Sequence, residues 1–130
     1  MMATHLRPVL VANGNAHLVT LVVRLLESMR HKYALMVISQ PAELRQYLRD
    51  TLRASRLPAA IVLNSREAVG IALLAWMRDQ RNDIADIPIV ALGTGPRPLH
   101  SHFVGTVMES PTADRLIDAL RDVLQKEMEC

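Results

Sequence analysis

Short apolar runs alternate with amphipathic segments along this chain, and this alternation limits the possible folds more than any other feature. The segments between the runs repeat their apolar residues every three to four positions, as a helix with one buried face does. The apolar runs have the length of buried strands, and they lie at residues 9–12, 33–38, 59–63, 87–92 and 105–109. Strands that alternate with helices form a parallel sheet covered by helices on both faces. The sequence therefore predicts an α/β fold.

The order of the strands follows from general rules of chain connection. Right-handed crossovers leave few topologies for five such units, and the flavodoxin-like order 2-1-3-4-5 is the commonest. We expect a three-layer sandwich with about five helices, in which Pro96 and Pro98 keep the fourth helix short. Ser39 is the expected N-cap of the second helix, with Pro41 in its first turn. In this topology the ligand crevice lies at the carboxyl ends of the first and third strands.

Length and composition point to one domain over residues 1–130. A chain of this size buries enough apolar surface to fold without a disulfide or a structural metal, and the lack of a second domain favours a stand-alone protein. The net charge is +2 and only four residues are aromatic, which argues against nucleic acid as a partner. The longest uncharged apolar stretch, residues 68–77, is too short to span a bilayer. Without a signal-peptide pattern, the expected location is the cytoplasm.

Four segments resemble the receiver domains of two-component response regulators, and together they cover nearly the whole chain. These segments are PVLVANGN at 8–15, PAAIVLN at 58–64, DIPIVALG at 86–93 and VMESP at 107–111. In the family they correspond to the first strand with its acidic loop, the strand ending on the phosphoacceptor aspartate, the strand before a Thr or Ser, and the strand with a Lys-Pro step. The resemblance implies a CheY-like fold and a role in bacterial signal transduction.

The residues that carry phosphorylation in that family are replaced in this chain. The resemblance places the acidic pair on Asn13 and Gly14, the phosphoacceptor on Asn64, the hydroxyl residue on Gly93 and the lysine on Ser110. A neutral amide cannot act as the nucleophile of an aspartyl phosphorylation. Mg²⁺ is usually bound through carboxylates, and a transferring phosphoryl group needs its charge neutralised. We therefore predict a degenerate pocket that takes no cofactor and no metal, in a pseudo-receiver that is not an enzyme.

Two further positions belong to the same pocket. Pro111 keeps the residue expected from the family, and the Ser110–Pro111 bond is a candidate for the cis form. Thr94 could supply the missing hydroxyl if the register slips by one residue. This would restore one part of the phosphorylation machinery while the others stay absent.

The sequence leaves more than one function open. The first is a phosphorylation-independent protein-interaction or dimerisation module in two-component or phosphorelay-type signalling, with a protein partner or a second copy as ligand. The alternative is a small-ligand sensor or a small flavodoxin-like enzyme that uses the crevice at Asn13, Asn64 and Thr94. A third hypothesis is a nucleic-acid-associated regulator with a basic stripe, formed by Arg45, Arg49 and Arg53 on the second helix. A solvated helix face is the simpler explanation of that stripe.

Other residues are candidates for partner contacts or ligands. The third predicted helix has ten consecutive residues without a charge, which makes Trp76 a candidate anchor of a contact surface. His100 and His102 are two residues apart, but no third ligand is near enough in sequence to predict a metal site. The last helix carries charged residues that could form ion pairs between subunits, namely Arg115, Asp118, Arg121 and Asp122.

Overall fold

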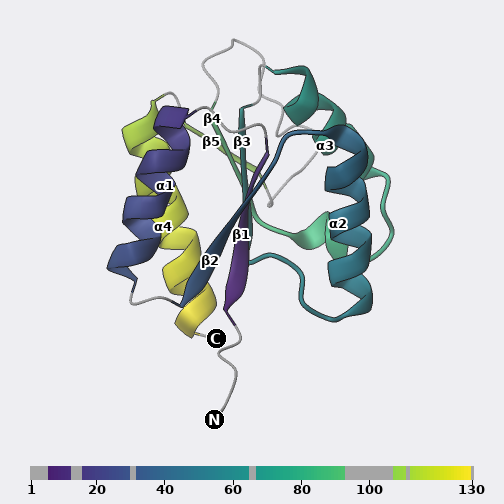
Figure 1. Cartoon of the computed structure of the whole chain (residues 1–130), viewed down its shortest axis with the longest axis horizontal. Helices are drawn as coiled ribbons and strands as arrows, with labels where there is room; N and C mark the ends of the chain where they lie inside the picture. The colour runs from purple at the N-terminus through teal and green to yellow at the C-terminus, as the bar shows by residue number, and fades with distance from the viewer. Residues whose placement is uncertain are drawn as a thin grey trace.

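The computed structural model describes residues 6–12, 16–29, 32–64, 67–92, 107–110 and 112–129, with residues 107–110 and 127–129 as backbone only. The strands are β1 (Arg7–Ala12), β2 (Tyr33–Ile38), β3 (Ala60–Asn64), β4 (Ile89–Leu92) and β5 (Val107–Ser110). The helices are α1 (Ala16–Ser28), α2 (Pro41–Arg53), α3 (Ala68–Arg78), the 3₁₀ turn η1 (Asp83–Asp86) and α4 (Ala113–Glu129). Figure 1 shows three layers, with α1 and α4 on one face of the sheet and α2 and α3 on the other.

The five strands form one parallel sheet in the order β2-β1-β3-β4-β5. This confirms the predicted fold class and strand order. The central strands are buried on both faces, which is why they read as continuous apolar runs rather than as alternating ones. None of the helices within the described residues is long and apolar enough to cross a bilayer.

The sheet divides the core into two clusters because side chains alternate between its faces. On β1, Val9 and Val11 point to the α1 and α4 side, whereas Leu10 and Ala12 point to the α2 and α3 side. The first cluster is closed by a stripe of buried leucines on α4, which are Leu116, Leu120 and Leu124. The buried hydroxyl of Tyr33 donates a hydrogen bond to the Leu124 carbonyl at 3.1 Å, which joins β2 to the end of α4.

Two details of the chain differ from the sequence expectations. Ser39 is not the N-cap of α2, because Gln40 occupies that position in extended geometry and makes no side-chain cap bond. The physical reason is Pro41, which disfavours helical geometry at the preceding residue and fits the first position of a helix. The 3₁₀ turn η1 was not expected, and it is started by Asn82, whose side chain accepts a hydrogen bond from the Ile84 amide at 3.0 Å. The predicted short fourth helix lies outside the described residues.

A left-handed residue ends α2 and allows a first prediction. Ser55 has a φ of 56°, and the amides of Ser55 and Arg56 close the helix end by donating to the carbonyls of Leu52 and Thr51. Glycine is the usual residue at such a position because it has no Cβ to oppose this φ. We expect Ser55→Gly to raise the free energy of unfolding by about 0.5–1 kcal/mol.

Urea unfolding followed by circular dichroism measures this change. Ala54→Gly is the matched control, because Ala54 is the adjacent residue but has a φ of −82°. Glycine at that position gains nothing from conformation and adds freedom to the unfolded chain. A Ser55→Gly variant no more stable than Ala54→Gly would contradict the expected relief of strain.

Candidate functional site at the carboxyl edge of the sheet

The strands that precede the predicted pocket end side by side. Asn64 at the end of β3 is aligned with Leu92 of β4, which is aligned with Ser110 of β5. β1 ends at Ala12 in the parallel register next to β3. The topology thus brings together the strand ends on which the predicted site depends. The remaining predicted pocket residues, with the Ser110–Pro111 bond, lie outside the described residues, and they are Asn13, Gly14, Gly93, Thr94 and Pro111.

Asn64 is held at this edge by the start of α3. Its side chain is half-buried, and its carbonyl accepts a hydrogen bond from the Glu67 amide at 3.2 Å. Gly70, in the first turn of α3, packs so closely that a Cβ at this position would overlap the Asn64 carbonyl oxygen. The carbonyl of Asn64 is therefore in contact with the first turn of α3, and the residue at the predicted phosphoacceptor position is an amide.

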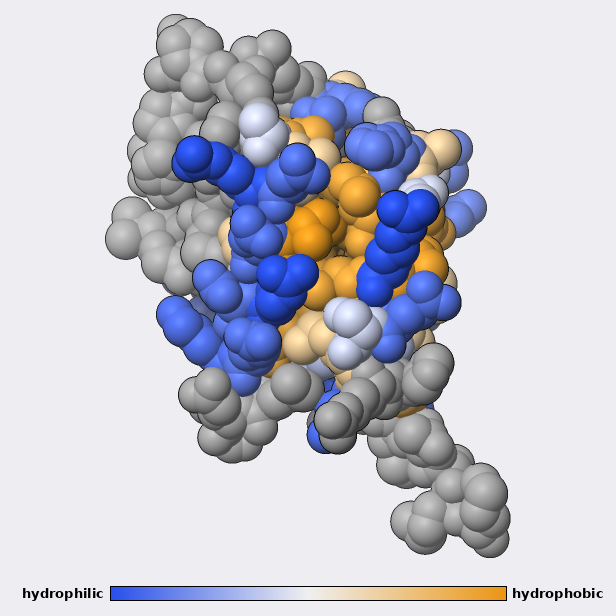
Figure 2. Space-filling model, turned by 90° about the vertical axis from the view of Figure 1, so that its left-hand side faces the viewer, coloured by the Kyte–Doolittle hydropathy of each residue, from blue (hydrophilic) through white to orange (hydrophobic). Residues whose placement is uncertain are grey.

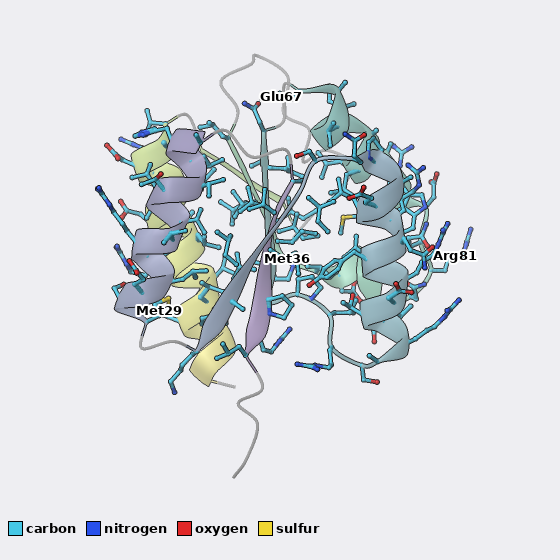
Figure 3. All side chains as sticks on the ribbon, viewed as in Figure 1. Met29, Met36, Glu67 and Arg81 are labelled. Atoms are coloured by element: carbon cyan, nitrogen blue, oxygen red, sulfur yellow. The ribbon has the colours of Figure 1, made fainter. Side chains whose placement is uncertain are left out.

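Glu67 is a residue of this edge that the sequence analysis did not single out. It is the N-cap of α3 in extended geometry, three residues after Asn64, and Figure 3 places it where β3 leads into α3. Its position at a helix start is a signal in the sequence, since acidic residues are favoured there. Within the part of the chain that the structure describes, no group of three or more His, Cys, Asp or Glu residues is arranged to hold a metal ion.

A cavity of about 540 Å³ lies at the opposite end of the strands from Asn64. The guanidinium of Arg7, at the start of β1, donates a hydrogen bond to the Leu57 carbonyl at 3.0 Å beside it. Burial raises the pKa of Tyr47 on α2, and the charge of Arg56, which lines the cavity, acts in the opposite direction. The lining residues are Leu6, Arg7, Pro8, Leu52, Ser55, Arg56, Leu57 and Asp83.

The predicted basic stripe and the predicted tryptophan anchor meet between α2 and α3. The Arg49 guanidinium lies 5.6 Å from the centre of the Trp76 ring, a distance at which a cation is attracted to an aromatic face. Trp76 is half-buried and packs against the core cluster below α2 and α3. Arg45 is half-buried and Arg53 is exposed. The middle of the stripe is therefore engaged with Trp76, and Trp76 presents only part of its ring to a partner.

The charged residues predicted for the last helix all lie on its exposed side. Arg121 pairs with Asp118 on the same helix, with 3.2 Å between Nη1 and Oδ1. Arg115 and Asp122 are exposed beside them. A pair three residues apart on a solvated helix stabilises only weakly, so these charges remain accessible for a contact between proteins.

Several solved response regulators have the same architecture as this chain. The response regulator of red-light signalling in R. palustris superposes with a TM-score of 0.63 at 18% identity, and the match covers 91% of each chain. The Mn²⁺-bound form of response regulator Rcp1 gives a TM-score of 0.66 at 17% identity over 90% of this chain and 91% of that one. The phosphorylated cyanobacterial phytochrome response regulator RcpA gives 0.66 at 17% identity, with 91% of each chain covered.

No protein-family model and no curated protein matches this sequence. The structural likeness is therefore carried by the order of the strands, the placement of the helices and the length of the chain. At this level of identity it establishes a common architecture. The chain has the CheY-like fold of response-regulator receiver domains.

Proposed function

We propose that this chain is a single-domain pseudo-receiver, a cytoplasmic signalling module that works by binding a protein partner without being phosphorylated. It would act in bacterial two-component or phosphorelay-type signalling. The observation that carries the proposal is the presence of an amide, Asn64, at the end of β3. This residue stands at the carboxyl end of the central strand β3, where the resemblance to receiver domains places the phosphoacceptor, and its carbonyl contacts the start of α3.

The chemistry of the site supports a role without catalysis. A side-chain amide has no lone pair basic enough to attack a phosphoryl donor, so Asn64 cannot form an aspartyl phosphate. The sequence continues β1 with Asn13 and Gly14, which add no carboxylate for a divalent cation. With neither nucleophile nor metal ligands, the conformation of the domain would be set by what it binds.

Incubation with acetyl phosphate and Mg²⁺, followed by intact-mass spectrometry, tests this proposal. We expect no phosphoryl adduct on the protein, while a receiver with its aspartate intact is labelled in the same reaction. The Asn64→Asp variant is the matched comparison. It restores the nucleophile alone, so we expect it to remain unlabelled because Asn13 and Gly14 still bind no metal. A stable adduct on the unaltered protein would overturn the proposal.

A further inference from the structure

The outer edge of β2 has the features of a strand that is completed by another strand. Among the described strands, β1 is the only one that pairs with β2, so every second residue of β2 directs its backbone N–H and C=O groups toward the outer edge. Its six residues, YALMVI, include no charge and no proline. Exposed edges are normally protected by charged side chains, prolines or bulges, because unpaired strands recruit other strands. The lack of such protection marks this edge as a place for intermolecular pairing.

Two large apolar side chains are exposed at the middle of this edge. Met36 is 40% exposed and Val37 is 42% exposed. In the parallel register Met36 lies beside Leu10 and Val37 beside Val11, so the two side chains lie on opposite faces of the sheet. Figure 3 shows Met36 on the strand nearest the viewer, between the two helix layers. Each face of the sheet thus has one uncovered apolar side chain at the same level of β2.

A shallow hollow continues this apolar surface onto α1. It has a volume of about 160 Å³, and Val23 and Leu35 line it from the helix and the strand. Its other lining residues are Leu26, Glu27 and Tyr33. Figure 2 shows the side of the molecule formed by α1 and α4, where apolar surface gathers in the middle between polar rows. The residues that line the hollow come from both β2 and α1, so the apolar edge of the strand continues onto the adjacent flank of α1.

We propose that a second copy of this chain covers this edge, with the two β2 strands paired antiparallel about a two-fold axis at Met36. This register places Met36 opposite Met36 of the partner subunit on the α2 and α3 face. On the other face it places Val37 opposite Leu35 of the partner subunit. Residues directly opposite in an antiparallel pair have Cβ atoms about 4.5–5.5 Å apart. Both exposed side chains are then covered by one symmetric contact, as a two-fold interface requires.

The helix layer permits the same arrangement. α1 packs over β1 and β2. Because neighbouring strands are about 4.8 Å apart, joining two β2 edges places the two α1 helices about 10 Å from one another. This is the usual distance between packed helices. The Val23 sides of the two helices would then close over the hollow from both subunits, and the two sheets would form one continuous sheet.

Charge at the two ends of the strand favours a second copy over an unrelated strand. Lys32 precedes β2, and Glu43 lies in the first turn of α2 beyond its other end, and both residues are exposed. Antiparallel pairing about Met36 brings the start of one β2 next to the end of the other, so Lys32 would lie toward the start of α2 of the partner subunit, which carries Glu43 in its first turn. An uncharged strand with a basic residue before it and an acidic residue after it is complementary to its own copy. The inference that the partner is a second copy rests on the proposed function as an interaction module.

Sedimentation equilibrium of the whole chain tests the self-association. We expect a concentration-dependent dimer, and we expect Val37→Lys to weaken it by roughly tenfold or more, because each copy brings a charge to the centre of the edge. Ile71→Lys is the matched control, since Ile71 is 47% exposed but lies on α3. It should dimerise as the unaltered protein does. Circular dichroism verifies that both variants fold. A monomeric unaltered protein, or a dimer insensitive to Val37→Lys, would overturn the proposal.

Cross-linking tests the two-fold axis. Opposed residues of an antiparallel pair have Cα atoms about 4.5–5.5 Å apart, within the range that a disulfide spans. In a Cys130→Ser background, Met36→Cys should form a disulfide-linked dimer on mild oxidation, whereas Ile71→Cys should not. Equal cross-linking of both variants, or none at Met36→Cys in a dimeric sample, would exclude this axis.

A charge exchange tests the register and separates this inference from the proposed function. Lys32→Glu should weaken the dimer, and adding Glu43→Lys should restore it, because the opposite charges then face each other again. Failure of the second change to restore association would exclude the register. Absence of a dimer together with absence of a phosphoryl adduct would remove the second copy as partner and leave the pseudo-receiver proposal intact. A phosphoryl adduct on a dimeric protein would overturn the pseudo-receiver proposal and leave the second copy as partner.

Discussion

Gly70→Ala is expected to lower the free energy of unfolding by about 2 kcal/mol, although alanine is the better helix former. Gly70 is buried in α3, and a Cβ at this position would overlap the carbonyl oxygen of Asn64. The clash is with backbone, which cannot rotate away as a flexible side chain can. The helix would have to move off the end of β3, and this movement would loosen the packing of Leu63 and Leu73 on that face.

Thermal and urea unfolding followed by circular dichroism measure this effect. For a domain of this size, a loss of about 2 kcal/mol corresponds to a melting temperature lower by about 8 °C. Ala72→Gly provides the comparison, because Ala72 is an exposed residue of the same helix. There, glycine should cost about 1 kcal/mol through helix propensity alone. If Gly70→Ala instead stabilised the protein by a similar amount, the close approach of α3 to Asn64 would be disproved.

Leu120→Ala is expected to have the largest effect of any change considered, a loss of about 3 kcal/mol of unfolding free energy. Leu120 is fully buried at the centre of the α4 stripe, where it packs against the sheet and α1. Its removal forfeits apolar burial and leaves a cavity, because the rigid sheet on one side limits how far the neighbours can collapse. Val123→Ala, on the half-buried flank of α4, should cost about 1 kcal/mol.

Comparing the losses of unfolding free energy in these two variants tests whether α4 directs Leu120 into the core. Chemical denaturation of both variants, with equal dependence on denaturant, gives the two free energies on one scale. Similar losses for Leu120→Ala and Val123→Ala would mean that α4 does not direct Leu120 into the core. A large loss only for Leu120→Ala would support the placement of α4 over the sheet.

Much of this architecture could be predicted because it depends on local patterns and a few general rules. The bounds predicted for the strand of residues 33–38 are those of β2, since six consecutive apolar residues between polar neighbours specify a strand. The strand order followed from the handedness of crossovers rather than from any single residue. The prediction of Ser39 as the N-cap of α2 was wrong. Pro41 favours extended backbone at the residue directly before it, so Gln40 is the N-cap and the helix begins one residue later than expected.

The sequence predicted where the candidate site lies but not the contacts that surround it. Asn64 was placed at a strand end by the apolar run before it, and β3 does end there. The contact of Gly70 with the Asn64 carbonyl and the approach of Arg49 to the Trp76 ring join separate segments of the chain. They depend on how helices pack on a sheet, and no pattern within one segment contains that information.

For this protein the sequence by itself determined the parallel α/β fold, the strand order and the uncharged residues at the predicted pocket positions, because periodicity and side-chain chemistry can be read along one chain. Only the tertiary structure decided which apolar residues remain uncovered. Met36 and Val37 belong to a strand as apolar as its neighbours, and they are exposed because β2 lies at the edge of the sheet. Burial depends on the neighbours that folding brings to a residue, so the same kind of strand is core in the centre of a sheet and surface at its edge.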